Sequence, residues 1–335
     1  MTRTIQAKAI RAGIAFAASA LLAGGSPAAD RDPALPPIAV FGNITTFEIA
    51  PVLLAADRLY PGKATVSMGS LANLVGAAGV PGYQSAGKAD VATNAETQAL
   101  RYSVDHPDLQ IIMTVSEGHY RIVARRSAGI ARLADLRGKR IGTVPGTSSG
   151  YFLHRMLASA GLREADVTVV PITPITDMPR ALADKRVDAL TIWEPEIEKA
   201  AQAIGADAIA FGGKGVYREL FNLNTTAAAL ADPARRARIV AFVAKVIEAS
   251  HRIAADPSIA WPLVEAASGY PHAIVVASWS HQSFPAALAP DLLDVMVTEE
   301  LYLAAQAKRP ARSRAQIARL IDSSVIADAQ RLAGD

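Results

Sequence analysis

Residues 132–151 read RLADLRGKRIGTVPGTSSGY and carry the most informative pattern in the chain. A strand candidate at 140–144 leads into a glycine-bearing turn of hydroxyl residues, and a helix candidate follows the turn. Such a turn aims backbone N–H groups, hydroxyls and the positive end of a helix at one point, which suits a carboxylate, sulfonate, phosphate or other acceptor-rich group. The alternative is that Thr147 or Ser148 only caps its own helix. The spacing by itself leaves both interpretations open.

From about Pro36 onward, short apolar runs alternate with amphipathic segments. This alternation predicts an α/β protein whose parallel strands are covered by helices. One helix is expected near Thr46, where the run Thr-Thr-Phe-Glu has capping-box spacing, and another from about Ser149 to Gly161. Beyond Asp232 the pattern is mostly helical. The expected strands are 38–41, 64–68, 90–93, 109–115, 120–125, 140–144, 167–171, 187–192, 208–211 and 222–228.

Two segments have the character of domain crossings rather than ordinary loops. The first, 116–119, interrupts two β-prone runs, and the second lies within the glycine-rich segment 212–215. Between them is a block of about five strands, which is small but large enough for a domain. The alternative is one continuous sheet with a hairpin at Gly118.

The N-terminus predicts an exported protein. Arg3, Lys8 and Arg11 precede an Ala-rich apolar run, which is too short to span a bilayer, and Ser-Pro-Ala at 26–28 fits a cleavage box. We therefore expect residues 1–28 to be a signal peptide that is cleaved near Ala28, which leaves the mature chain in the periplasm. Removing those three of the 34 basic residues leaves 31 against 31 acidic ones, so nucleic-acid binding loses its support.

Composition narrows the classes of protein further. The 335 residues suggest about two domains, and 51% hydrophobic with 19% charged residues indicates a globular chain. The absence of Cys excludes disulfides, thiolate metal sites and cysteine nucleophiles. The six His are scattered, so the sequence predicts no metal site and no cofactor.

Three motifs resemble one family of transport proteins. The run LADLRGKRIG with the following GTSS resembles the second-domain entry of substrate-binding proteins of nitrate-, sulfonate- and taurine-type ABC importers. The segment VDALTIWEP at 187–195 resembles that family's Val-Asp-Ala…Trp-Asp/Glu-Pro segment, and GKADVA at 87–92 is similar to an earlier strand. The resemblance covers roughly residues 38–329. The family that it indicates includes binders of thiamine-pyrimidine precursors.

This resemblance implies a type II periplasmic-binding fold, in which two α/β lobes are joined by two crossover segments and hold the ligand in the cleft between them. Residues 36–116 and 218–335 would form lobe 1, and 117–217 would form lobe 2. The expected partners are a small-molecule ligand and an ABC permease in the inner membrane, and the protein itself is expected to be a monomer.

Candidate ligand-binding residues follow from the rule that open α/β sheets bind ligands beyond the carboxyl ends of their strands. They are Asn43, Thr45, Thr46, Asn94, Glu96, Ser116, Glu117, Thr147, Ser148, Ser149, Trp193 and Glu194. These loops contain three carboxylates and no Arg or Lys, which disfavours a bare anion. A sulfonate that also carries an amine, or a nitrogen heterocycle, fits better, with Trp193 stacking on its apolar or cationic face.

Other functions remain as alternatives. The pattern Gly-Thr-Ser-Ser-Gly at 146–150 matches the nucleophile elbow of a secreted serine hydrolase, with Ser148 as nucleophile, but no His-Gly-Gly-Gly oxyanion segment is present. A cytoplasmic synthase of the thiamine pyrimidine is disfavoured, because the resemblance there rests on a cysteine-rich motif. A sensory binding domain that signals rather than imports is not distinguished by the sequence.

Overall fold

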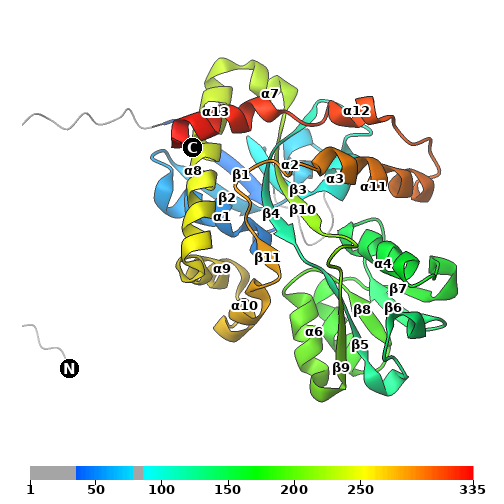
Figure 1. Ribbon diagram of the computed structural model, residues 1–335. Helices are drawn as coiled ribbons and strands as arrows, with labels where there is room; N and C mark the ends of the chain where they lie inside the picture. Colours follow the sequence, from blue (N-terminus) through cyan, green and yellow to red (C-terminus); the bar gives the residue numbers. More distant parts are fainter. Residues whose placement is uncertain (1–34, 78–85, 335) are drawn as a thin grey trace, which may run out of the picture. The chain divides into compact units, whose positions relative to one another are not determined.

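Two separate β-sheets organise the chain (Figure 1), and the computed structural model describes residues 35–77 and 86–334. The predicted signal peptide therefore lies outside the described residues. The first sheet has the order β11-β4-β10-β3-β1-β2 and the second the order β7-β6-β8-β5-β9. The strands of the first sheet are β1 (Ile38–Gly42), β2 (Ala64–Met68), β3 (Val91–Ala95), β4 (Leu109–Gly118), β10 (Glu219–Thr226) and β11 (Gln282–Ser283). Those of the second are β5 (Arg121–Arg125), β6 (Arg140–Thr143), β7 (Thr168–Pro171), β8 (Ala189–Thr191) and β9 (Ala208–Gly212).

The predicted α/β fold is confirmed, because every predicted strand segment overlaps an observed strand. Parallel pairing joins β1 to β2 and β3, and β6 to β7 and β8. The carboxyl ends of the parallel strands therefore lie together at one edge of each sheet. β10 runs antiparallel to β3 and β4, so its first residue, Glu219, pairs with Gly118 at the carboxyl end of β4.

The chain passes between the sheets twice. β4 belongs to the first sheet and β5 to the second, while β9 belongs to the second and β10 to the first. The alternative of one continuous sheet is therefore wrong. The first passage also begins later than predicted, because Ser116 and Glu117 are still paired within β4, and the chain leaves the first sheet only after Gly118.

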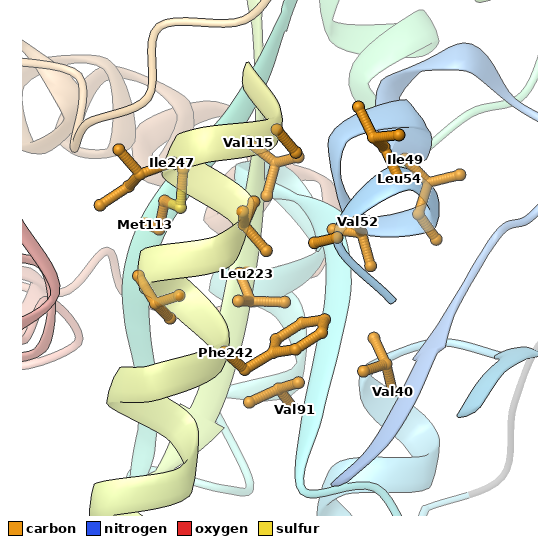
Figure 2. Close-up of a cluster of buried hydrophobic side chains, with 14 of the residues drawn as sticks. Val40, Ile49, Val52, Leu54, Val91, Met113, Val115, Leu223, Phe242 and Ile247 are labelled. Atoms are coloured by element: carbon orange, nitrogen blue, oxygen red, sulfur yellow. The ribbon is translucent and has the colours of Figure 1, made fainter. Parts of the chain in front are cut away.

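Helices cover both faces of the first sheet. On one face, Phe242 and Ile247 of the long helix α8 pack against Val91, Met113 and Leu223, with α1 and α13 beside them (Figure 2). On the other face α2, α3, α11 and α12 surround a second apolar cluster. The helices here are α1 (Ala50–Leu54), α2 (Leu71–Val75), α3 (Glu96–Tyr102), α7 (Ala227–Ala231), α8 (Pro233–Ala255), α9 (Trp261–Ser268), α10 (His272–Trp279), α11 (Leu292–Gln306), α12 (Arg314–Ala318) and α13 (Ser323–Ala333).

The second sheet is covered in the same way by three helices. Phe152 and Met156 of α4 (Ser148–Ser159) pack on one face, and the helices α5 (Met178–Ala183) and α6 (Glu196–Ile204) pack on the other. Gly161, which ends the predicted helix, has a φ of 69°, a left-handed conformation that glycine adopts readily.

The helix predicted near Thr46 is present in a different form. A 3₁₀ turn (Phe47–Ile49), α1 and a π turn (Ala55–Leu59) follow one another without a break. The predicted capping box, with Thr45 as N-cap and Glu48 three residues later, is wrong: the turn has Thr46 as its N-cap, and the N–H and hydroxyl of Thr45 both donate to Oδ1 of Asn43.

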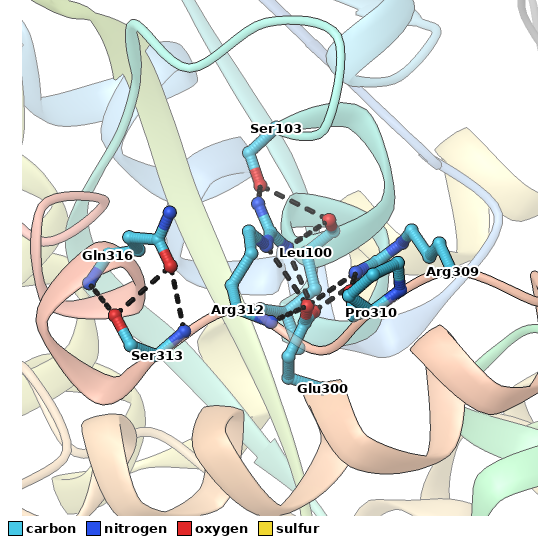
Figure 3. Close-up of polar contacts among 8 residues, drawn as sticks. All are labelled: Leu100, Ser103, Glu300, Arg309, Pro310, Arg312, Ser313 and Gln316. Carbon is cyan, nitrogen blue, oxygen red and sulfur yellow. Dashed lines mark hydrogen bonds and ion pairs between the residues drawn. The ribbon is translucent and has the colours of Figure 1, made fainter.

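A buried ion-pair cluster fixes the C-terminal helices to α3 (Figure 3). Glu300 of α11 is almost fully buried and accepts hydrogen bonds from Arg309 and Arg312. Arg312 also donates to the carbonyl of Leu100 and to the hydroxyl of Ser103. Burial acts to raise the pKa of Glu300, but the two arginines outweigh it and lower the pKa to about 2.

Among the residues that the structure describes, no helix is both long and apolar enough to cross a membrane.

Candidate ligand-binding site

A cavity of about 540 Å³ is lined by loops from both sheets. This volume is within the range of small-molecule sites, roughly 300–1,000 Å³. From the first sheet come Asn43, Thr45, Thr46 and Glu48 after β1, and Met68 at the end of β2 with Gly69 and Ser70 after it. The same sheet adds Thr93, Asn94, Ala95, Gln98, Arg101 and Tyr102 from β3 and α3, and Glu219 and Phe221 from β10. The second contributes Val144, Pro145, Thr147 and Ser148 after β6, Thr173, Pro174, Ile175 and Thr176 after β7, and Trp193 after β8.

The structure brings seven of the twelve sequence-predicted residues together around this cavity: Asn43, Thr45, Thr46, Asn94, Thr147, Ser148 and Trp193. The loop after β1 is closed by its own side chains, since the Asn43 carboxamide oxygen accepts from the backbone N–H of Thr45 at 3.1 Å and from its hydroxyl at 2.7 Å. Such a turn fixes the loop before any ligand arrives.

The turn between β6 and α4 does not cap its own helix. Thr147 occupies the N-cap position, yet its hydroxyl donates to the carbonyl of Val144 at 2.7 Å. Ser148 donates its hydroxyl to Oε1 of Glu219 at 2.8 Å and lies 3.0 Å from the hydroxyl of Tyr120. The capping interpretation is therefore wrong. Ser148 instead ties the second sheet to β10 of the first.

Two of the five remaining predicted residues lie behind the cavity wall. Glu96 is fully buried and accepts hydrogen bonds from the hydroxyl of Tyr217 at 2.6 Å and from the backbone N–H of Leu220 at 2.9 Å. Ser149 is also fully buried, and its hydroxyl donates to the carbonyl of Thr191 at 2.6 Å. Both side chains hold elements of the fold together.

The other three are also outside the cavity lining. Ser116 donates its hydroxyl to the carboxamide of Gln282, and Glu117 forms an ion pair with Arg218 at 3.0 Å. Glu194 forms an ion pair with Arg121 at 2.9 Å. Burial raises the pKa of Glu194 to about 7 despite that arginine.

Two carboxyl groups that sequence reasoning missed do line the cavity. Glu48 is 2% exposed and Glu219 is 3% exposed. Burial raises the pKa of Glu48 to about 7, although a hydrogen bond with Thr46 partly offsets the shift. Burial also raises the pKa of Glu219 well above its ordinary value, and the nearby charges of Glu48 and Glu96 add to the effect.

One cation lines the cavity as well, which corrects the expectation that no Arg or Lys would be near. Arg101 comes from α3, and its Nη1 donates to the carbonyl of Gly146 at 3.0 Å. Gln98 donates to the same carbonyl at 3.2 Å. Both donors are in α3, which packs on the first sheet, and the acceptor is in the turn after β6 of the second sheet. These contacts therefore join the two sides of the cavity mouth.

The fold is that of solved periplasmic binding proteins, which this chain resembles in structure. The alkanesulfonate-binding protein SsuA from Xanthomonas axonopodis pv. citri, bound to MOPS, matches with a TM-score of 0.65 at 19% identity, over 86% of this chain and 98% of that one. The periplasmic aliphatic sulphonate binding protein SsuA from Escherichia coli matches with a TM-score of 0.67 at 18% identity, over 86% and 92%. The desulfurization enzyme DSZB shares the fold as well, with a TM-score of 0.61 at 13% identity over 89% and 99%. The fold alone therefore does not decide between binding and catalysis.

The family follows from the sequence. The family model described as NMT1/THI5 like matches residues 46–258, which is more than half of the chain, and the protein belongs to this family. A binding protein of Brucella abortus strain 2308 is 40% identical over 77 residues. That match covers 23% of this chain, and it spans only 23% of the relative's own length.

Proposed function

We propose that the protein is the extracytoplasmic solute-binding component of an ABC importer. It captures a small organic solute in the cavity between the sheets and delivers it to a permease in the inner membrane. The observation that carries this proposal is the cavity itself, which is lined by strand-end loops of both sheets. The family and the sulfonate-binding structural neighbours support the same role.

The proposal includes the two lobes predicted from the sequence, 36–116 with 218–335 and 117–217. Support comes from the two passages of the chain between the sheets, near Gly118 and after Gly212. The bonds from Arg101 and Gln98 to the carbonyl of Gly146 exist only while the lobes meet. We therefore assign the structure to the closed form, which a ligand stabilises by touching both lobes.

We also propose that the mature protein is a periplasmic monomer, that its signal peptide is cleaved near Ala28, and that it catalyses no reaction. Against the hydrolase alternative, the groups within hydrogen-bond distance of the Ser148 hydroxyl among the described residues are Tyr120 and Glu219, with no histidine. A serine nucleophile needs a base that can take its proton, and histidine fills that role in the hydrolases with this elbow.

The test is a ligand screen on protein that has been unfolded and refolded to remove any co-purified solute. The panel contains nitrate, taurine, alkanesulfonates, amines, amidines and pyrimidines. A ligand at about 100 times its Kd adds roughly 2.7 kcal/mol to the free energy of unfolding, which raises Tm by several degrees.

Two variants, one at the N-cap of α4 and one within that helix, locate the binding. Thr147→Trp fills the cavity and should abolish the shift, whereas Ala158→Trp, on the exposed side of the helix, should leave it unchanged. The proposal fails if no compound raises Tm. It also fails if the wild type hydrolyses p-nitrophenyl acetate and Ser148→Ala abolishes that activity.

A further inference from the structure

Two carboxyl groups from distant parts of the chain share one wall of the cavity. Glu48 comes from the turn after β1 and Glu219 from the start of β10, and their side chains interact with each other. Ser148 satisfies one oxygen of Glu219, but no donor in the described parts of the chain reaches Oε2 of Glu48 or Oε2 of Glu219. Buried acceptors without donors are rare in folded proteins, and a ligand is one way to satisfy them.

A second polar group at the cavity also lacks a partner. Thr93 is 1% exposed and lines the cavity, and within the described residues its hydroxyl makes no hydrogen bond. The indole N–H of Trp193, which follows β8 of the second sheet, is also buried. Among the described residues it has no hydrogen-bond acceptor. The cavity therefore offers both carboxylate acceptors and neutral polar groups to a solute.

The ionisable groups around the carboxyl pair are mostly acidic. Glu96 and Glu299 lie fully buried behind the cavity wall, and burial raises the pKa of both carboxyl groups. Arg101 is the only Lys or Arg among the described lining residues, and its Nη1 is engaged at the cavity mouth. A cation at the pair would favour the ionised form of the carboxyl groups and be attracted by it, whereas an anion would be repelled by that form.

Apolar side chains make up much of the remaining wall. Met68, Tyr102, Pro174, Ile175, Trp193 and Phe221 are among them. Such walls suit an organic body with an apolar or aromatic face.

We propose, building on the solute-binding function above, that the solute is an organic cation whose ammonium or amidinium group donates hydrogen bonds to Glu48 and Glu219. Its apolar or aromatic part lies against the wall that includes Trp193. The carboxyl pair thereby selects the solute by charge, and a simple inorganic anion is excluded.

The test uses matched pairs of probes that differ in charge and little in shape. Benzamidine is compared with neutral benzamide, and benzylamine with benzyl alcohol, by isothermal titration calorimetry on the refolded mature protein. The wild type should bind each cation at least about tenfold more tightly than its neutral counterpart, which is about 1.4 kcal/mol. Glu48→Gln and Glu219→Gln should each remove most of that preference while they leave the affinity for the neutral probes unchanged.

Glu117→Gln is the matched control, because this carboxylate pairs with Arg218 outside the cavity lining, and it should keep the preference for cations. The inference is overturned if neither cation binds, if cations and neutral probes bind equally, or if the glutamine variants keep the wild-type preference. Binding of nitrate or benzenesulfonate alone would overturn this inference and leave the proposed function standing. Binding of no member of either panel would overturn both.

Discussion

Replacing Glu48 by glutamine should change how the stability of the ligand-free protein depends on pH. Burial raises the pKa of Glu48 from 4.5 to about 7, so the folded state holds a proton that the unfolded state releases between those values. The free energy of unfolding of the wild type therefore falls as pH rises through this window, by up to about 1.4 kcal/mol per pH unit. The fall over the whole window is about 3 kcal/mol.

Glutamine does not titrate, so Glu48→Gln removes this fall. The difference in free energy of unfolding between variant and wild type should shift by about 3 kcal/mol in favour of the variant when pH is raised from about 4.5 to about 8. Urea unfolding followed by circular dichroism at both pH values measures the shift. Asp57→Asn, an exposed surface change, is the control and should show no comparable shift. An equal difference at both pH values, or a shift in favour of the wild type, would refute the assignment of Glu48 as a buried, protonated carboxyl.

Three further outcomes are expected. Trp193→Phe should abolish the ligand-dependent change in tryptophan fluorescence, because the other two tryptophans pack in the core beside the first sheet; a retained change would contradict this. Arg101→Ala should weaken ligand binding about fivefold, or about 1 kcal/mol, because it removes the hydrogen bond to the carbonyl of Gly146. Calorimetry measures the change, and an unchanged Kd would show that this contact does not stabilise the bound form. Glu300→Gln should lower the free energy of unfolding by about 3 kcal/mol at neutral pH, since it breaks the buried pairs of Figure 3. Because the arginines hold the pKa of Glu300 at about 2, the extra stability of the wild type over Glu300→Gln should be lost as pH falls from 4.5 toward 2. A difference in the free energy of urea unfolding that persists at about pH 2 would argue against the pairing.

The sequence predicted the fold well because its strands coincide with short apolar runs, which strands bury when helices cover their sheet. The run 64–68, for example, matches β2 residue for residue. β11 (Gln282–Ser283) was missed because two polar residues paired with β4 carry no periodic signal. The capping box of Thr45 and Glu48 failed for another reason: the side chain of Asn43 accepts from both the N–H and the hydroxyl of Thr45, and the helical turn begins one residue later.

The site was predicted only where the rule of carboxyl strand ends applies. That rule finds Asn43 and Thr147, which follow β1 and β6. It misses Glu219, because β10 is antiparallel and its amino end meets the carboxyl ends of its neighbours. Arg101 was missed because it reaches the cavity from the second turn of a helix. Glu96 was included because it directly follows β3, yet a loop position does not say on which side of the wall a side chain lies.

The two passages between the sheets also have a mechanical consequence. β4 and β10 are paired up to Gly118 and Glu219, and the pairing resumes in the second sheet between Arg121 and Gly212. The two connections thus form one ribbon with a short interruption, and bending is easiest where the ladder is broken. Glu219 stands at that interruption, so a rotation of one sheet against the other would leave Glu219 nearly stationary and move the lining loop 173–176, which follows the edge strand β7, much farther. A solute held by Glu219 would then be seated at the pivot before the opposite wall arrives, and the two walls would contribute to affinity in succession rather than together.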